Sequence, residues 1–314
     1  MPASDSIAGA LPVELCDVTK AYGGAQVLDR INLTVSAGER LVLVGHNGAG
    51  KTTLMKLLLG LARPSAGKVA VFGQDPVASR SAARRGALGY LPESIAFDEA
   101  MTGRELLKFY AGLKGVNGNA CDELLQRVGI ADAADRRLGT WSKGMRQRLG
   151  LAQAMLGHPR LLLLDEPTSG LDPSLRSTFY GIINNLNANG VSVLISSHAL
   201  NEVEDHADRV AIMRHGRLLA CGTLTQLAEQ AALPVSVRVV CTPGEAGTIA
   251  ERFDGGVDIK CVDDRTLTFD CPHVEKMAVL RRITDLGDVV QDVDIHLPRL
   301  DEIYAHFMAG DPGQ

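Results

Sequence analysis

Residues 45–53 read Gly45-His46-Asn47-Gly48-Ala49-Gly50-Lys51-Thr52-Thr53, and they match the pattern GxxxxGK[ST]. The apolar run 40–44 before them predicts a buried strand, and residues 51–61 after them predict a helix. Between a strand and a helix, such glycines let backbone N–H groups curl round phosphate oxygens, and the helix start adds its positive dipole end. Lys51 would then reach the β- and γ-phosphates of a nucleotide, and Thr52 would hold Mg²⁺ through its hydroxyl. The competing interpretation is an ordinary glycine-rich turn, which the flanking strand and helix disfavour.

A second informative segment is Leu161-Leu162-Leu163-Leu164-Asp165-Glu166. Four consecutive leucines predict a central strand that delivers two carboxylates at its end. Asp165 would support the Mg²⁺ shell, and Glu166 would polarise the attacking water as a general base. An acidic pair after an apolar strand is common, so taken alone it is equally compatible with a structural role. Its position after the 45–53 loop, and directly before Pro167-Thr168-Ser169-Gly170-Leu171-Asp172, favours the catalytic interpretation.

The order of apolar runs along the chain predicts two domains. Over residues 13–232, short apolar runs alternate with longer helical stretches, which is typical of an α/β sheet with crossover helices. Within this part, 13–18 and 27–35 predict antiparallel strands, and 102–138 predict a polar helical insert. Beyond Pro234 the predicted order is β-α-β-β-α-β, that of a small ferredoxin-like α+β unit. We therefore expect an N-terminal tail (1–12), a nucleotide-binding domain (13–232), a C-terminal accessory domain (233–310) and a short tail (311–314).

The composition excludes several classes of protein. Apolar residues make up 46% and charged residues 22% of the chain, as in ordinary globular proteins. Only 4% of the residues are aromatic, the net charge is −5, and beyond residue 232 there are 15 Asp and Glu against 8 Lys and Arg. The acidic segment beyond residue 232 would repel a phosphate backbone, and the few aromatic residues disfavour stacking on bases, so no nucleic-acid partner is expected. No apolar run approaches the roughly 18 residues of a membrane span, and the first residues do not form a secretory signal. We expect a cytoplasmic protein that meets the membrane only through a partner.

Through these motifs, residues 13 to about 230 resemble the ATP-binding cassette (ABC) family. The segment Trp141-Ser142-Lys143-Gly144-Met145-Arg146-Gln147-Arg148 is similar to the family's LSGGQ signature, with Lys143 and Met145 in place of the usual Gly and Gln. The resemblance implies an ABC-type P-loop ATPase fold, built from a central sheet, an antiparallel subdomain and a helical insert. It also implies that Ser142 and Gly144, which are kept, contact a γ-phosphate. By itself, a serine at the start of a helix is usually only an N-cap.

The same resemblance gives roles to three further positions. Tyr22 resembles the aromatic residue that stacks on adenine, and His198 resembles the switch histidine that senses γ-phosphate. Taken singly, they would be a turn residue and a surface residue. Glu93 stands where the family usually has Gln, and its carboxyl oxygen can still meet Mg²⁺, although the change puts the coupling to a partner in question.

The expected site therefore has three groups of residues. The catalytic group is Glu166 and His198, and the Mg²⁺ group is Thr52, Glu93 and Asp165. The ATP-binding group is Tyr22, Gly45, Asn47, Gly48, Ala49, Gly50, Lys51, Thr52, Thr53, Ser142 and Gly144.

The resemblance also implies partners. Two cassettes must face each other, each capping the other's ATP, and this chain has one cassette, so a second copy or a paralogue is expected. ATP-driven closure of that dimer would power a pair of membrane permease subunits. Four passages, 89–93, 110–115, 142–153 and 294–304, are similar to the ATPase of the nos-type transporter that serves nitrous oxide reductase maturation. That subgroup implies a periplasmic partner which helps to assemble a copper centre.

Other functions remain open at this point. ATPases of drug, haem or sodium exporters share the Lys-Gly-Met signature. A soluble ATP-driven switch on ribosomes or DNA is disfavoured, because such relatives usually hold two cassettes and a basic linker. The C-x-H pair Cys271 and His273 suits soft metals, but spacing places no third ligand beside it, which favours ordinary packing. Leu297, Leu300, Ile303, Tyr304 and Phe307 fall at helical spacing, and we expect them to pack on the sheet of the C-terminal domain.

Overall fold

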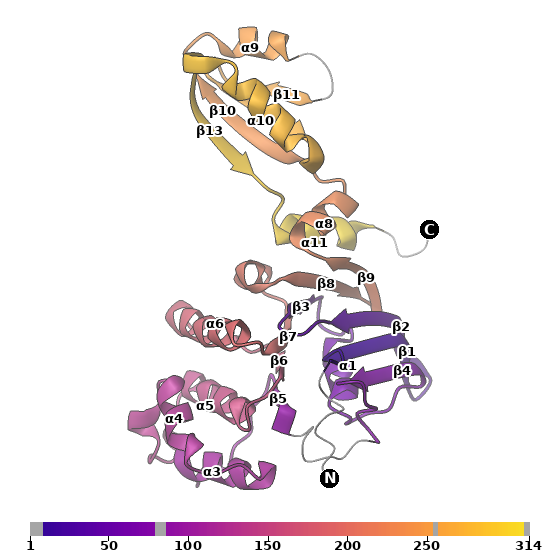
Figure 1. The fold of residues 1–314 in the computed structure, drawn as a ribbon, viewed down its shortest axis with the longest axis vertical. Helices are drawn as coiled ribbons and strands as arrows, with labels where there is room; N and C mark the ends of the chain where they lie inside the picture. Colours follow the sequence, from indigo (N-terminus) through magenta and orange to yellow (C-terminus); the bar gives the residue numbers. More distant parts are fainter. Residues whose placement is uncertain (1–8, 79–85, 254–256, 311–314) are drawn as a thin grey trace. The chain divides into compact units, whose positions relative to one another are not determined.

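The computed structural model describes residues 9–78, 86–253 and 257–310 (Figure 1). These residues form two compact units, Met1–Cys221 and Gly222–Gln314. The described residues exclude most of the expected N-terminal tail and the expected tail 311–314. The expectation that the first residues do not form a secretory signal also falls outside them. In the part that is described, no helix is both long enough and apolar enough to cross a membrane.

The first unit contains a six-stranded sheet with the order β5-β6-β7-β3-β8-β9. Strands β5, β6, β7, β3 and β8 pair in parallel, so their carboxyl ends meet at one edge. Every residue of β6 and β7 is buried, and each strand contains an uninterrupted apolar stretch, residues 161–164 in β6 and 193–195 in β7. The strands are β3 (Arg40–Val44), β5 (Leu88–Leu91), β6 (Leu161–Asp165), β7 (Ser192–Ser197), β8 (Arg209–Arg214) and β9 (Arg217–Gly222).

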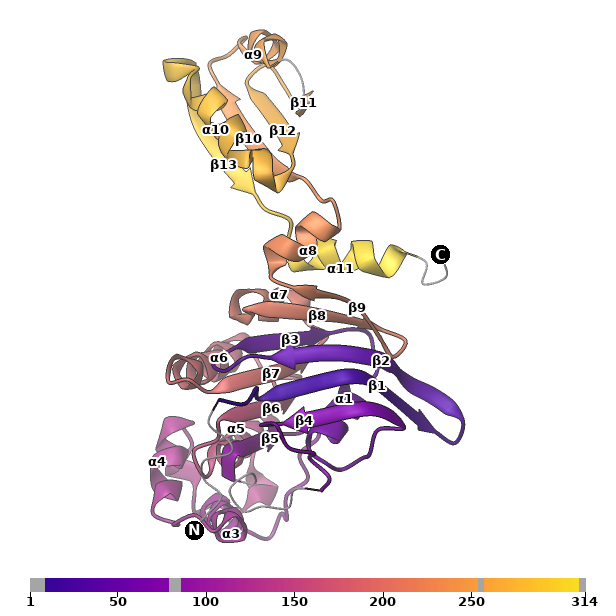
Figure 2. The same cartoon turned by 45° about the vertical axis from the view of Figure 1, so that its right-hand side comes forward.

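A second, antiparallel sheet has the order β2-β1-β4 (Figure 2). It contains β1 (Val13–Tyr22), β2 (Ala25–Val35) and β4 (Ala66–Val71), and it matches the antiparallel pair expected from the sequence. One apolar core joins this sheet to α1 (Lys51–Leu58) and to β3. The helix that follows the glycine-rich loop is therefore held from both sheets.

The expected helical insert is confirmed as α3 (Gly103–Lys114) and α4 (Ala120–Arg127), which contact each other and α5 (Lys143–Met155). Helix α3 begins with a capping box, in which the Thr102 hydroxyl accepts from the Glu105 N–H and the Glu105 carboxylate accepts from the Thr102 N–H. Two more helices follow β6 and β7, namely α6 (Pro173–Ala188) and α7 (Leu200–Val203).

The second unit confirms the β-α-β-β-α-β order. Its antiparallel sheet has the order β11-β12-β10-β13, and side chains from the sheet, α9 and α10 form a separate apolar core. The elements are β10 (Val235–Cys241), α9 (Ala246–Arg252), β11 (Asp258–Cys261), β12 (Thr266–Cys271), α10 (Lys276–Thr284) and β13 (Val290–His296).

Two details of the second unit differ from expectation. The unit begins at Gly222 and not near Leu233, because α8 (Leu224–Gln230) contacts α11 (Leu300–Ala309). Helix α11 does not pack on the sheet either: Leu300 and Ile303 are buried but are not part of the core beneath α9 and α10. The chain leaves the sheet after His296 through Leu297, which is 50% exposed, and Pro298, and this exit carries α11 to α8.

Candidate active site

The glycine-rich loop connects β3 to α1 by a path that needs glycine. Gly48 and Gly50 have φ values of +83° and +108°, which side-chain-bearing residues rarely adopt. At Gly45, a Cβ atom would lie only 2.5 Å from the Met213 carbonyl oxygen of β8. The first turn of α1 has no acidic residue and no side-chain cap, so its N–H groups and its dipole are available to an anion.

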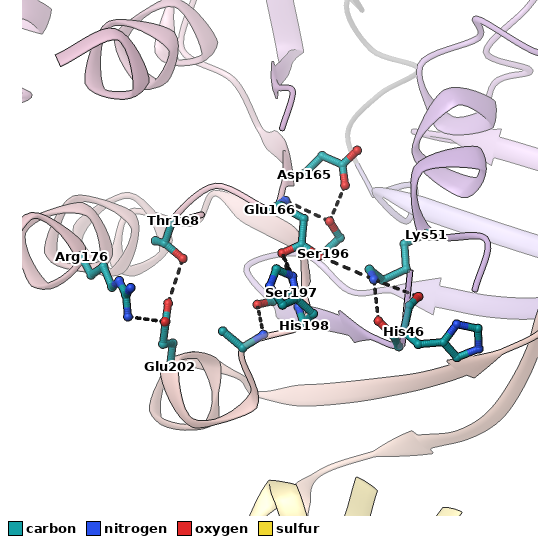
Figure 3. A network of polar contacts seen from close by, with 12 residues as sticks. His46, Lys51, Asp165, Glu166, Thr168, Arg176, Ser196, Ser197, His198 and Glu202 are labelled. Carbon is teal, nitrogen blue, oxygen red and sulfur yellow. Dashed lines mark hydrogen bonds and ion pairs between the residues drawn. The ribbon is translucent and has the colours of Figure 1, made fainter. Parts of the chain in front are cut away.

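Lys51 joins this loop to the acidic end of β6. Its side chain is 7% exposed, and its Nζ atom donates to the Gly45 carbonyl oxygen at 2.6 Å (Figure 3). The same Nζ lies 3.5 Å from Glu166 Oε1. A buried ammonium group needs such partners, because desolvation is otherwise costly. The two sequence motifs therefore meet in space through one ion pair.

Asp165 and Glu166 are held at the end of β6 by the neighbouring strand. The Ser196 hydroxyl of β7 donates to Asp165 Oδ1 and accepts from the Glu166 N–H at 3.1 Å. Glu166 has a φ of +46°, a left-handed conformation that is unfavourable for a residue other than glycine. Sequence reasoning missed Ser196, although a serine directly after the apolar residues 193–195 of a buried strand was a signal.

The two oxygens of the Glu166 carboxylate have different partners. Oε2 accepts from the His198 N–H at 3.3 Å and lies 2.7 Å from His198 Nδ1 (Figure 3). Oε1 is buried and makes no hydrogen bond within the described part of the chain, and it faces Lys51. The His198 ring itself is more than half exposed, so it can be reached from outside. A buried carboxylate oxygen that accepts no hydrogen bond, beside the Lys51 ammonium, keeps a lone pair that can accept a proton from a water molecule.

A cleft of about 270 Å³ brings most of the expected site together. Its walls come from β2, the loop after β3, the first turn of α1, the segment after β5 and the end of β6. Val27 and His46 are the two lining residues that sequence reasoning did not select. The lining residues are Val27, His46, Asn47, Gly48, Ala49, Gly50, Lys51, Thr52, Thr53, Glu93, Asp165 and Glu166.

Several expected residues do not line this cleft. Tyr22 is 47% exposed at the end of β1, with Lys20 Nζ 4.4 Å from its ring centroid. Ser142 is the N-cap of α5, and its hydroxyl accepts from the Met145 N–H at 3.3 Å. Gly144 is buried inside the first turn of the same helix. Within this single chain, the LSGGQ-like segment therefore forms a helix start and does not reach the cleft.

Tyr90 was also missed by sequence reasoning. It lies on β5 before Glu93, and burial, together with the charges of Asp165 and Glu93, raises the pKa of Tyr90 to about 12. The phenol is thus protonated at neutral pH, and its environment is negatively charged. Glu93 itself is exposed at the mouth of the cleft.

The loop after Glu166 is anchored by α7 as well. The Glu202 carboxylate accepts from the Thr168 hydroxyl at 3.0 Å and forms an ion pair with Arg176 (Figure 3). Glu202 comes four residues after His198. The segment that carries His198 is therefore tied to the segment that carries Glu166 at two points, His198–Glu166 and Glu202–Thr168.

The donor set of the cleft fits Mg²⁺ that arrives with a nucleotide. In the ranges that the structure describes, no group of three or more His, Cys, Asp or Glu side chains is placed to enclose a metal ion. Thr52, Glu93 and Asp165 nevertheless line one cleft. Mg²⁺ is commonly held by one or two carboxylates plus substrate phosphates, so an incomplete protein shell is what such a site requires. In the second unit, Cys271 packs in the apolar core, and burial raises the pKa of its thiol.

Comparison with known proteins agrees with this geometry. Residues 28–169, which include both sequence motifs, match the family model described as ABC transporter. The chain is 34% identical over 302 residues to the daunorubicin resistance ATP-binding protein DrrA3 of Streptomyces coeruleorubidus, covering 93% of this chain and 94% of that protein. It is 38% identical to the bacitracin transport ATP-binding protein BcrA of Bacillus licheniformis, covering 66% and 68% of the two chains. A solved structure of an ATP-binding subunit of an ABC transporter is 30% identical, with a TM-score of 0.65, and the match covers 70% of this chain and 93% of that one.

Proposed function

The chain belongs to the ABC transporter family as an ATP-binding subunit, and from this membership we propose that it is the ATPase of an exporter. Subunits of this family hydrolyse ATP, dimerise and work with membrane permease partners. The observation that carries the proposal is the position of the Glu166 carboxylate, with Lys51 at one oxygen and His198 at the other.

The proposed reaction is attack of water on the γ-phosphate of ATP, which breaks the bond between the γ-phosphorus and the β–γ bridging oxygen and releases ADP and inorganic phosphate. The β- and γ-phosphates are bound by backbone N–H groups of residues 45–51 and by the Lys51 ammonium. To bind them, Lys51 gives up its hydrogen bond to the Gly45 carbonyl oxygen and donates to a phosphate oxygen instead. Glu166 Oε1 polarises the water and takes its proton. His198 holds the other carboxylate oxygen, and its exposed ring would contact the γ-phosphate. Mg²⁺, when bound by Thr52, Asp165 and Glu93, supplies positive charge beside the phosphates.

We propose that the nucleotide site is completed by a second subunit, most simply another copy of this chain. Ser142 and Gly144 lie outside the cleft of their own chain, which supports a role for them at the nucleotide of the partner. Tyr22 is exposed enough to stack on the adenine ring. ATP binding would then close the two subunits, and hydrolysis would let them separate.

For the cargo, we propose a drug or an antibiotic. The two named relatives are a daunorubicin resistance protein and a bacitracin transport protein. The former match covers 93% of this chain, so it extends into the second unit, and that unit is not a mark of the nos-type subgroup. Neither relative supports nitrous oxide reductase maturation, which stays a prediction from residues 89–93, 110–115, 142–153 and 294–304. Through its permease, the chain would lie on the cytoplasmic face of the membrane.

Growth of a deletion strain tests the cargo. Cells that lack this chain are compared with cells that carry the wild type or Glu166→Gln. Growth is measured across a panel of antibiotics, and the copper content of nitrous oxide reductase is measured in parallel. Antibiotic sensitivity that the wild type reverses and Glu166→Gln does not reverse is the expected result. Unchanged antibiotic resistance together with a copper-deficient reductase would contradict the drug-exporter proposal and favour the nos-type transporter.

A further inference from the structure

The first turns of α5 are packed directly against the loop that follows Glu166. At Gly144 a Cβ atom would lie 2.7 Å from Leu175 Cδ1 of α6, so the start of α5 packs closely on this side chain. Lys143 reaches across the loop, since a Cβ at Gly170 would lie 2.5 Å from Lys143 Nζ. Residues three and four apart lie on one helix face, so position 147 faces the same loop as 143 and 144.

Gln147 makes a specific bond on this face. Its side chain is 3% exposed, and its Nε2 atom donates to the Pro167 carbonyl oxygen at 2.7 Å. Pro167 directly follows Glu166, whose left-handed backbone is maintained only by the surrounding contacts. On the amino side, the Glu166 N–H is held by Ser196. On the carboxyl side, Gln147 fixes the next residue.

We propose that Gln147 is a positioning residue for Glu166. It keeps the loop after the carboxylate in the conformation in which the two carboxylate oxygens face Lys51 and His198. The inference rests on the proposed role of Glu166 as the base. Because Gln147 lies on the helix that begins at Ser142, a displacement of the LSGGQ-like segment reaches the base through one buried hydrogen bond. A shift of about 1 Å in a catalytic group can cost on the order of 10² in rate, so the bond affects hydrolysis and not nucleotide binding.

The first test replaces the amide by an apolar group of similar size. In the full-length chain, Gln147→Leu should lower kcat by about 10- to 100-fold while the Kd for ATP stays within about twofold. Gln153→Leu makes the same change further along α5, at a half-buried position, and should leave kcat unchanged. The proposal is overturned if Gln147→Leu retains the wild-type kcat. It is also overturned if kcat, ATP affinity and melting temperature fall together, because that result describes a purely structural residue.

A second variant gives kcat a pH dependence that a loss of packing alone would not cause. Gln147→Glu places a carboxyl group against the Pro167 carbonyl, where only its protonated form can donate a hydrogen bond. Burial favours that neutral form, so the ratio of variant to wild-type kcat should rise as the pH falls. For Gln147→Leu the ratio should not change with pH. A ratio for Gln147→Glu that stays flat over the pH range in which the introduced carboxyl titrates would show that the bond to Pro167 does not govern the base.

A double-mutant cycle separates this inference from the proposed function. In a Glu166→Gln background, Gln147→Leu should cause no further loss of the residual hydrolysis, because its only effect acts through the base. A multiplicative loss would contradict the proposal. If Glu166→Gln alone hydrolyses ATP like the wild type, the proposed function fails. If Glu166→Gln is inactive and Gln147→Leu is normal, only the role of Gln147 fails.

Discussion

His198 Nδ1 lies 2.7 Å from Glu166 Oε2, and this contact joins the ends of two adjacent parallel strands, β7 and β6. The backbone N–H of His198 donates to the same oxygen at 3.3 Å. Glu166 is nearly buried and His198 is exposed, so the pair connects a carboxylate inside the cleft with a ring that solvent can reach. This arrangement orients one oxygen of the carboxylate and leaves the other beside Lys51.

Replacing His198 should therefore impair hydrolysis more than binding. For His198→Ala we expect kcat to fall on the order of 10²-fold, because the carboxylate loses one orienting contact and the γ-phosphate loses a hydrogen-bond donor. His198→Gln, which can still donate, should recover part of the loss. His296→Ala removes an exposed histidine of the second unit and serves as the control. Steady-state ATPase rates with equilibrium ATP binding check this prediction, and a His198→Ala variant with a normal kcat would contradict it.

Ser142→Arg tests whether the nucleotide site is shared between subunits. Ser142 caps α5 outside its own cleft, so the variant should bind ATP alone yet fail to complete the site of a partner. An excess of Ser142→Arg subunits is mixed with Lys51→Ala subunits. Hybrids should then contain one intact composite site and one doubly defective site, and they should bind ATP more tightly than either parent. If hybrids form and bind no more tightly than either parent, the shared-site model fails.

Tyr90 predicts a feature of the alkaline stability profile. Burial and nearby carboxylates raise its pKa from the ordinary 10.0 to about 12, so the unfolded chain loses the phenol proton first. The stabilising contribution is complete below pH 10 and is lost as the pH rises towards 12. With allowance for partial exposure, it amounts to about 1–2 kcal/mol. Urea unfolding at pH 9 and pH 11 should show a smaller pH-dependent loss for Tyr90→Phe than for the wild type. Tyr22→Phe, at an exposed ring, should behave like the wild type.

The second unit should be separable from nucleotide binding. Every residue that lines the cleft lies in the first unit, and Gly222 begins the second. Deleting residues 223–314 should keep the Kd for Mg-ATP within about threefold while weakening dimerisation or the response to the permease. Deletion from residue 234 is the less favourable variant, because it retains α8 without α11 and exposes Leu227. Loss of ATP affinity in a folded 1–222 chain, measured by calorimetry, would contradict this division.

The sequence predicted those parts of the molecule that depend on local pattern. The 45–53 motif predicted its strand, loop and helix, the leucines of β6 predicted a buried strand, and turn spacing predicted the β-α-β-β-α-β unit. The missed features arise from contacts between distant segments. Ser196 binds Asp165 and Glu166 only because β7 pairs with β6, and the left-handed conformation of Glu166 has no signature in a non-glycine residue. The packing of α11 on α8 was missed because helical spacing shows which side of a helix is apolar and not what covers it.

The central claim is that Glu166 is the general base for hydrolysis of a nucleotide that Lys51 binds. It is tested most directly by measuring ATP hydrolysis together with ATP binding for Glu166→Gln. This change keeps the size of the side chain and removes its basicity. We predict that hydrolysis falls by a factor on the order of 10² to 10⁴ while ATP remains tightly bound. Lys51→Ala should instead lose ATP affinity, and Lys56→Ala, at an exposed position of the same helix, should change neither quantity. Hydrolysis by Glu166→Gln at a rate near that of the wild type would contradict the account.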